Sequence, residues 1–457
     1  MLAAVEPVLV PLGLRLSPWS VAPFVATLVS LAVFPVAAPR LWHAHFPKIV
    51  LAIALTFVLP FLALFGGEAA HELGHILLAD YVSFLVIIIG LYAISGGMLV
   101  RGEIRGGPRT NTALLALGTL MASVAGTTGA SMILIRPILN ANAHRTRRAH
   151  IVVFFIFLVA NIGGCLTPLG DPPLFLGFLA GVPFFWTLHL APQLAVLATI
   201  LLAVFYAIDR SLSRREGAAA APARAPGARL RLDGKRNLAL LAIVVGAVAL
   251  SGFWHPGKAS VLGIGLPVEG LVHDAIILGC ALVSLLWTPR SLRADNAFGW
   301  EPVREVAIVF AGVFVTILPV LAILKTGPQG PFAPLFRVLD APWQYFWATG
   351  VLSSFLDNAP SYLAMLGTQI ETFHGDLAPR LGAAALSASH PRFLSAVSAA
   401  AVFMGGVTYI GNAPNFMVKT IAEQAGVEMP TFLGYIVRWS LPILGPVFVL
   451  LTILFFR

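Results

Sequence analysis

The chain has 457 residues, of which 58% are hydrophobic and only 11% are charged, and its net charge is +9. Because soluble domains carry about 25% charged residues, a string of soluble domains is excluded. The charges instead cluster in short stretches between long apolar runs, which is typical of a bundle of membrane-spanning helices. The basic excess then belongs to loops on one side of a membrane, and nucleic acid is not expected as a partner.

Eight apolar runs have the length that a helix needs to cross a bilayer, roughly 17–25 residues. They lie at 20–37, 48–66, 82–100, 188–208, 237–254, 270–288, 304–325 and 433–456. Four further apolar segments carry Gly, Pro, Asn, Asp or Thr in their middle: 111–142, 150–186, 343–368 and 393–425. We interpret 111–142 and 343–368 as re-entrant hairpins and the other two as broken spanning helices, which gives ten crossings. Cys165 and Cys280 lie apart within apolar segments, so neither a disulfide framework nor a metal cluster is expected.

The positive-inside rule supports this topology when the N-terminus is placed outside, because the predicted inner loops then hold most of the 29 basic residues. The segment 209–236 is basic, rich in Ala and Pro, and lacks an apolar face. We therefore expect it to be a flexible cytoplasmic connector between a first membrane repeat, 1–208, and a second, 237–457. No basic region and small-residue cleavage site precede the first apolar run, so no cleaved signal peptide is expected.

Each part has five crossings, so the second part enters the membrane with the opposite orientation to the first. That is an inverted-topology repeat, an arrangement shared by many secondary transporters. One pattern, T-x-x-G-[D/N]-x-P, occurs in both broken helices, at Thr167–Pro173 and Thr408–Pro414. The hairpin tips correspond as well, at Gly126–Ser131 and Asp357–Ser361. We predict an all-α polytopic membrane protein of two inverted-topology repeats, each with a re-entrant hairpin and a broken transmembrane helix.

Unpaired backbone groups cost several kcal/mol each in hydrocarbon, so broken helices survive there only inside protein or beside a wet cavity. Backbone carbonyls and carboxylates at such breaks suit cations, and half-helix N-termini suit anions. Asp171 and Asp357 are acids within the broken segments, which makes each a functional candidate, although each also fits the cap of a half-helix. An Asp that binds Na⁺ when ionised and releases it when protonated would couple cation to proton movement.

Two basic residues leave alternatives open. Arg136, in the return arm of the first hairpin, would neutralise an acid, attract an anionic substrate, or extend to the inner interface. Lys419, in the second broken helix, allows the same interpretations.

One motif favours another class of protein. His71-Glu72-Leu73-Gly74-His75 is an H-E-x-x-H sequence, which on a helix places two histidines for zinc and a glutamate as general base. It is similar to the motif of intramembrane zinc metalloproteases. The sequence lacks the downstream Asn-Pro-Asp-Gly type motif that such proteases use for a third ligand. We therefore expect an outer loop at 71–75 whose histidines face water, no enzymatic activity, and no bound cofactor.

Four stretches together, 126–137, 161–187, 353–366 and 408–426, resemble the ion transporter superfamily. The resemblance extends over roughly residues 45–456 and is closest to NhaD-type sodium/proton antiporters and the neighbouring citrate-transporter branch. It implies paired hairpins and broken helices, homodimers, and an elevator-like movement of a transport domain against a scaffold. Carried over by motif, it implies these ion-binding residues: Thr127, Thr128, Ser131, Asn161, Thr167, Gly170, Asp171, Asp357, Asn358, Ser361, Thr408, Gly411, Asn412 and Asn415.

The sequence departs from the dicarboxylate-transporting relatives, which have Ser-Asn-Thr at both hairpin tips. Two acids and no Arg in the tip motifs favour a cation as substrate. Two functions stay open: exchange of cytoplasmic Na⁺ or Li⁺ for external protons, and Na⁺- or H⁺-coupled transport of an anion such as citrate or arsenite. The expected location is the bacterial inner membrane, and the expected partners are small cations, protons, lipid and a second copy of the chain.

Overall fold

The computed structural model describes residues 11–457, except 102–103, 217–230, 255, 297 and 328–329. Helices make up most of this described part, which confirms the predicted all-α class. Its only strands form two antiparallel pairs, β1 (Leu99–Arg101) with β2 (Arg231–Asp233) and β3 (Lys258–Val261) with β4 (Ile264–Pro267). These strands were not predicted, because three or four residues carry too little pattern to stand out beside long apolar runs.

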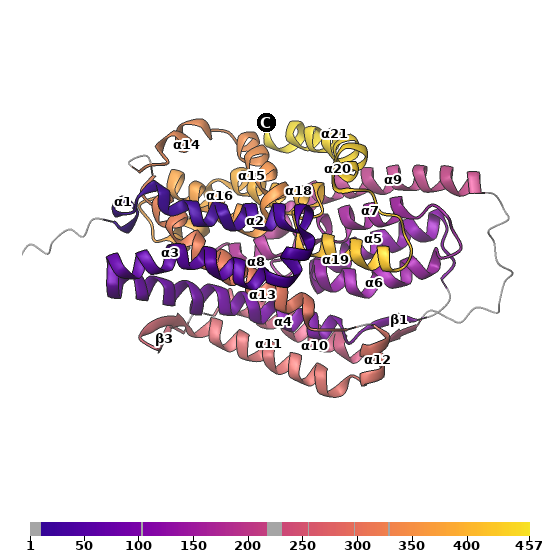
Figure 1. Ribbon diagram of the computed structural model, residues 1–457, viewed down its shortest axis with the longest axis horizontal. Coiled ribbons are helices and arrows are strands. Elements are labelled where there is room, and N and C mark those ends of the chain that lie inside the picture. Colours follow the sequence, from indigo (N-terminus) through magenta and orange to yellow (C-terminus); the bar gives the residue numbers. More distant parts are fainter. Residues whose placement is uncertain (1–10, 102–103, 217–230, 255, 297, 328–329) are drawn as a thin grey trace, which may run out of the picture.

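The part of the chain before the connector is a series of helices (Figure 1). Its elements are α1 (Leu12–Arg15), α2 (Ala22–Ala37), α3 (Pro39–His75), α4 (Val82–Ser95), α5 (Pro108–Ala125), α6 (Thr127–Ala141), α7 (Ala149–Leu158), α8 (Pro172–Leu179) and α9 (Ala191–Glu216). A π-helical turn, Ile76–Tyr81, joins α3 to α4. Within α3 the backbone kinks at Gly66, whose φ of 53° lies in the left-handed region that glycine tolerates best.

The part after the connector is also a series of helices. Its helices are α10 (Arg236–Ser251), α11 (Val268–Trp287), α12 (Arg290–Asp295), α13 (Glu301–Leu324), α14 (Ala333–Val338), α15 (Pro342–Leu356), α16 (Asn358–His374), α17 (Pro379–Ser389), α18 (Pro391–Met404), α19 (Ala413–Gln424), α20 (Phe432–Tyr435) and α21 (Leu441–Leu451). A final π-helical turn, Thr452–Phe456, continues α21 to the end of the chain.

Two expectations about irregular segments were wrong. Residues 71–75 are not a loop, because α3 continues after the Gly66 kink through His75. The connector does not begin at 209 either, because α9 continues to Glu216. There Asp209 is fully buried and bonds to Arg145 and to His150, so side-chain pairing supports the last turns of α9, after its fully buried apolar positions end at Phe205. Residues 217–230 of the predicted connector lie outside the described residues, and 231–233 form β2.

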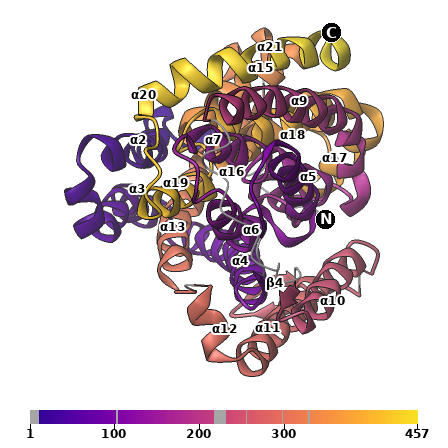
Figure 2. The same ribbon diagram turned by 90° about the vertical axis from the view of Figure 1, so that its right-hand side faces the viewer.

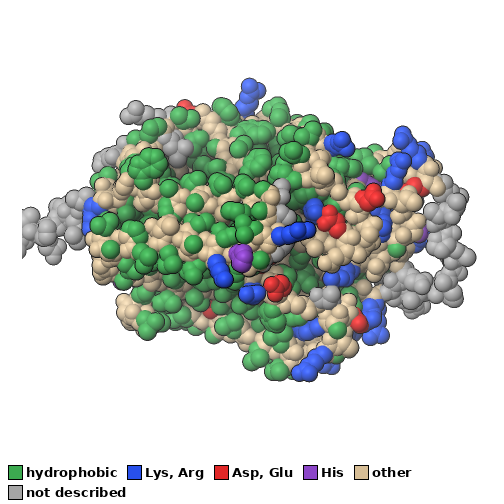
Figure 3. All heavy atoms as spheres, in the orientation of Figure 1, with side chains coloured by type: hydrophobic (Ala, Val, Ile, Leu, Met, Phe, Trp, Pro, Cys, Tyr) green, Lys and Arg blue, Asp and Glu red, His purple; other side chains and the backbone are tan. Residues whose placement is uncertain are grey.

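Six stretches of the described chain are helical, long and apolar enough to cross a membrane. They are Ala44–Ser95, Ala149–Leu166, Phe184–Glu216, Val268–Trp287, Glu301–Leu324 and Phe432–Phe456. The first has 52 residues and is bent at Gly66, so it covers two of the runs that the sequence predicted. Hydrophobic side chains cover much of the surface in Figure 3, and Lys and Arg gather toward the end where α9 and α12 lie. The chain is a multi-pass membrane protein.

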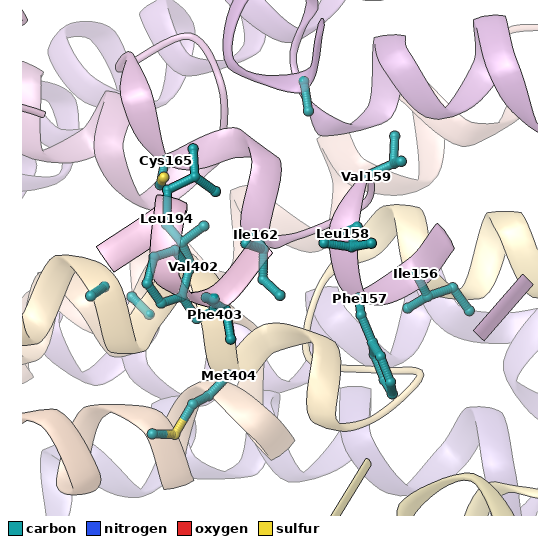
Figure 4. Packing of buried hydrophobic residues seen from close by; sticks show 14 of the residues in the cluster. Ile156, Phe157, Leu158, Val159, Ile162, Cys165, Leu194, Val402, Phe403 and Met404 are labelled. Atoms are coloured by element: carbon teal, nitrogen blue, oxygen red, sulfur yellow. The ribbon is translucent and has the colours of Figure 1, made fainter. Parts of the chain in front are cut away.

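The buried hydrophobic residues form two large cores, and each core draws on both parts of the chain. The first core contains α5, α6, α7 and α9 together with α15 to α21, and the second contains α2, α3 and α4 together with α10, α11 and α13. In Figure 2, α2 and α3 lie at the left edge and α10 and α11 at the lower edge, beside the helices of the first core. In the first core, Ile162 of the first broken helix lies beside Val402 and Phe403 of the second (Figure 4).

Candidate functional site

Each of two helix pairs turns back through a single residue. Gly126 joins α5 to α6 with φ 76° and ψ 152°, and Asp357 joins α15 to α16 with φ 67° and ψ 142°. Glycine adopts such angles without strain, whereas a residue with a Cβ in a sparsely populated region stores about 1–3 kcal/mol. Asp357 therefore holds a glycine-like conformation with a side chain attached, and strain of this kind concentrates at functional sites.

Each of two further helices is interrupted and restarts. After α7 the chain passes through a 3₁₀ turn, Ile162–Leu166, and a further turn at 168–170. The extended residue Asp171 then leads into α8. After α18 it passes through Gly405–Val407 and ends at Asn412 before α19 begins. Prolines at the first helical turns, Pro172 and Pro414, suit these restarts because that turn needs no intrahelical N–H partner.

The same side-chain bonds fix the turn and the break in both parts. The Thr167 hydroxyl donates to the carbonyl of Ser123, and the Thr408 hydroxyl donates to the carbonyl of Ser354. The Ser123 hydroxyl in turn donates to Gly163, and the Ser354 hydroxyl donates to Met404 at 3.1 Å. Neither serine was among the residues predicted from the sequence. A matching position in the two parts could have identified them, because Ser123 precedes Gly126 by three residues and Ser354 precedes Asp357 by three residues.

Asp171 is where the turns and the breaks meet. Its Oδ1 accepts hydrogen bonds from the Thr127 hydroxyl at 2.9 Å and from Asn412 Nδ2 at 3.0 Å, and its Oδ2 accepts one from Asn358 Nδ2. The backbone N–H of Thr127 also donates to the carbonyl of Gly170 at 2.8 Å. Asp171 is only 2% exposed, so neutral donors from three separate elements surround a buried carboxyl group.

Two asparagines join the broken helices to each other. Asn161 Nδ2 donates to Asn415 Oδ1 at 2.7 Å, and Asn415 Nδ2 donates to the carbonyls of Gly405 and Thr408. Asn161 Oδ1 and Asn358 Oδ1 are fully buried and have no hydrogen-bond partner among the described residues. Unpaired buried acceptors are costly, so these oxygens are suited to a ligand that brings positive charge or a proton.

A small cavity borders Asp171. Its volume is about 60 Å³, and its polar wall is the first tip and the first break, from Gly126 to Gly129 and from Pro168 to Pro172. The opposite wall is α4 of the second core, through Phe84, Ile87, Ile88, Leu91 and Tyr92. None of the described residues that line this cavity is Lys or Arg.

The remaining predicted site residues lie in different places. Thr128 lines the cavity, and Gly411 donates its N–H to the Thr408 hydroxyl at 3.1 Å. Ser131 is buried without a hydrogen-bond partner in the described chain, and Ser361 bonds the carbonyl of Asp357 within its own helix. These two serines are therefore not brought to Asp171.

Asp357 lies at the second tip but does not line the cavity. Its Oδ1 accepts the backbone N–H of Ala359 at 3.2 Å, so it caps α16, as the sequence had left open. The basic residues that the sequence singled out lie elsewhere. Lys419 pairs with Glu423 at 2.7 Å, and Arg136 donates to the carbonyl of Asn296 at 3.0 Å.

The metalloprotease alternative gains no support from the geometry. His71, Glu72 and His75 lie exposed on α3. The described residues contain no group of three or more His, Cys, Asp or Glu side chains placed to hold a metal ion.

Comparison with known proteins places the chain among transporters. None of the curated proteins matches this chain. The model of one protein family, described as "putative citrate transport", matches residues 13–456, which is nearly the whole chain. This confirms the predicted resemblance at the level of the transporter family that includes the citrate branch. With its apolar helices and its interrupted, polar-lined centre, the chain belongs to the "putative citrate transport" family.

Proposed function

We propose that the protein is a secondary active transporter that exchanges Na⁺ or Li⁺ for protons at Asp171. The observation that carries this proposal is the set of three neutral donors, Thr127, Asn358 and Asn412, around one buried carboxyl group. Neutral donors leave the carboxylate charge uncompensated, whereas a Lys or Arg would cancel it. A site of this kind attracts a monovalent cation when Asp171 is ionised and needs none when Asp171 is protonated.

The side chains that surround Asp171 can interact with the bare carboxylate and can also coordinate a cation bound to it. Asn358 and Asn412 each carry an amide oxygen beside the nitrogen that now donates, so rotation of the amide turns a donor to carboxylate into a ligand for a cation. The Thr127 hydroxyl can likewise donate to the carboxylate or offer its oxygen. Carboxylate, amide, hydroxyl and carbonyl oxygens are the donors that hard cations prefer. Proton and cation would therefore compete for the same oxygens, and this competition couples their movements.

The size of the cavity favours a small ion. Its volume of about 60 Å³ has room for a few water molecules. A Na⁺ or Li⁺ that keeps part of its water shell fits this space, and the described lining offers no Lys or Arg to pair with an anion such as citrate.

We further propose that the two parts of the chain are inverted-topology repeats and that α5–α6 and α15–α16 are re-entrant hairpins. The matching bonds of Thr167 and Thr408 and the matching angles at Gly126 and Asp357 support this interpretation. The two separate hydrophobic cores fit an elevator-like movement, in which the first core carries the site past the second. The clustered basic residues in Figure 3 favour a cytoplasmic position for that end. The resemblance to the ion transporter superfamily is the basis for proposing a homodimer in a bacterial inner membrane.

A second candidate function is coupled transport of an anion such as citrate, and the family description favours it. In that case the cation at Asp171 would be the coupling ion, and the anion would occupy an enlarged cavity between α4 and the hairpin tips.

Everted membrane vesicles with a pH-sensitive dye separate the two functions. Vesicles that respire and acidify are given Na⁺, Li⁺, K⁺ or citrate, and recovery of the dye signal reports proton efflux. The proposal expects recovery with Na⁺ or Li⁺ and none in vesicles that contain D171N. The exposed Asp376 supplies a matched control, D376N, which should behave like wild type. Recovery with citrate alone would select the second function.

A further inference from the structure

The surface between the two cores is apolar where it borders the site. Phe84, Ile87 and Leu91 of α4 face the first tip, and Ala125 and Ala359 beside the two tips belong to the second core by their contacts. Apolar contact is non-directional and scales with area, so such a surface alone does not fix one position of one core along the other. Hydrogen bonds and ion pairs depend on distance and angle, so they can fix it.

Arg136 makes one such contact near one end of the interface. It belongs to α6 in the first core, and its guanidinium donates to the backbone carbonyl of Asn296, just after α12, at 3.0 Å. Asn296 is itself held in place, because its Nδ2 donates to the carbonyls of Gly96 and Met98 at 3.2 and 3.1 Å. Arg136 therefore bonds to a fixed point. The sequence had left its role open, and the geometry directs it away from Asp171.

Arg380 makes a second contact. It lies in α17, and its guanidinium is 3.5 Å from Oε1 of Glu269, near the start of α11. The Glu269 side chain is 6% exposed and that of Arg380 is 48% exposed. α11 has 20 residues and is therefore about 30 Å long, and Figure 1 shows it running from β3 to α12. Arg380 therefore contacts the start of α11, and Arg136 contacts Asn296 beyond α12, the helix that follows the other end of α11.

We propose that Arg136 and Arg380 are positioning residues that hold the site-bearing core at its observed place against the second core. This inference rests on the proposed movement of one core past the other, because both bonds must break when that movement occurs. Each bond then stabilises the observed state relative to any displaced state. The contribution of Arg136 is the larger, since it is a charge-assisted bond in a half-buried setting, whereas exposed ion pairs contribute little.

The test measures the position of the cores directly in the full-length protein in lipid nanodiscs. Spin labels are placed at S211C on α9 of the first core and at R290C on α12, in a C165A/C280A background. Pulsed electron resonance then gives the distribution of distances between the labels. In R136Q we expect the ratio of the displaced to the observed population to rise about tenfold, and in R380Q about twofold. R136K should restore part of the R136Q change, because it keeps the charge but not the fork of donors.

Arg109 is the matched control, because it is an exposed arginine on the other arm of the same hairpin. R109Q should leave the distance distribution unchanged. An unaltered distribution in both R136Q and the double variant R136Q/R380Q would overturn the proposal, as would an equal shift in R109Q. The measurement needs no transport, so the two proposals fail separately. Wild-type protein without Na⁺/H⁺ exchange but with the R136Q shift would refute the transport function and leave the positioning role standing.

Discussion

Replacing Asp171 with asparagine tests the site most directly, because the side chain keeps its shape and loses only its charge. One amide oxygen can still accept from Thr127 and Asn412, where Asp171 Oδ1 does so now. The amide nitrogen would face Asn358 Nδ2, but rotation of Asn358 presents its unpartnered Oδ1 instead. All the hydrogen-bonding positions around residue 171 can therefore be refilled.

The expected stability change is small. Bonds to a charged group contribute about 1.5–3 kcal/mol each and neutral bonds about 0.5–1.5 kcal/mol, so three bonds lose about 3 kcal/mol in total. Removing a buried charge recovers several kcal/mol of desolvation, which offsets this loss. The effect on cation binding is large by comparison. A unit charge about 4 Å away contributes about 4 kcal/mol at an effective dielectric constant of 20, or about a thousandfold in affinity.

Purified protein allows both numbers to be measured. Thermal unfolding in detergent should place D171N within a few degrees of wild type. Isothermal titration with NaCl should show a loss of Na⁺ affinity of about a thousandfold, and the D376N control should show none. A folded D171N protein that binds Na⁺ with wild-type affinity would refute the role of this carboxylate.

Three further predictions concern the support of the site. D357G should raise the free energy of unfolding by about 1 kcal/mol, by relieving the strained φ of 67°, while slowing transport because a tip carboxylate is lost. R145M should lower the free energy of unfolding by about 3–5 kcal/mol, because it leaves Asp209 buried without its guanidinium partner. N161A should lower it by about 1–3 kcal/mol, because Asn415 Oδ1 loses its bond across the two broken helices. Thermal unfolding with a transport assay measures all three.

A different result would contradict each of these three predictions. A destabilised D357G protein would show that the tip conformation is not strained. R145M with wild-type stability would show that water reaches Asp209, and the exposed R109M is its matched control. For N161A, an unchanged unfolding temperature would show that the broken helices are held together by packing alone.

Much of the local structure was predictable because its causes are local. The sequence Thr167–Pro173 breaks a helix and restarts it, and its repetition at Thr408–Pro414 predicted the second break, as the structure has it. Asp357 was predicted as a functional acid at the second tip, but its backbone conformation was not. Its positive φ could not be inferred from residue type, because glycine is the residue whose presence indicates such angles. The angle depends instead on how α15 packs against α16.

Contacts between segments that are distant in the chain could not be predicted from the sequence. Nothing in the sequence pairs Arg136 with the carbonyl of Asn296, because any residue offers a backbone carbonyl. The helical continuation to Glu216 depends on Arg145 and His150, which are far away in the chain. Such contacts depend on how helices pack, and packing is a property of the whole bundle.

The sequence alone determined that this is a polytopic helical membrane protein with interrupted helices, because hydropathy and helix-breaking residues act within a few turns of chain. It also supplied nearly every polar residue of the candidate site. Only the tertiary structure decided that Thr127, Asn358 and Asn412 bond to one carboxyl group, Asp171, and that the helices sort into two cores. Convergence of this kind depends on three-dimensional distances between elements, which no spacing along the chain encodes.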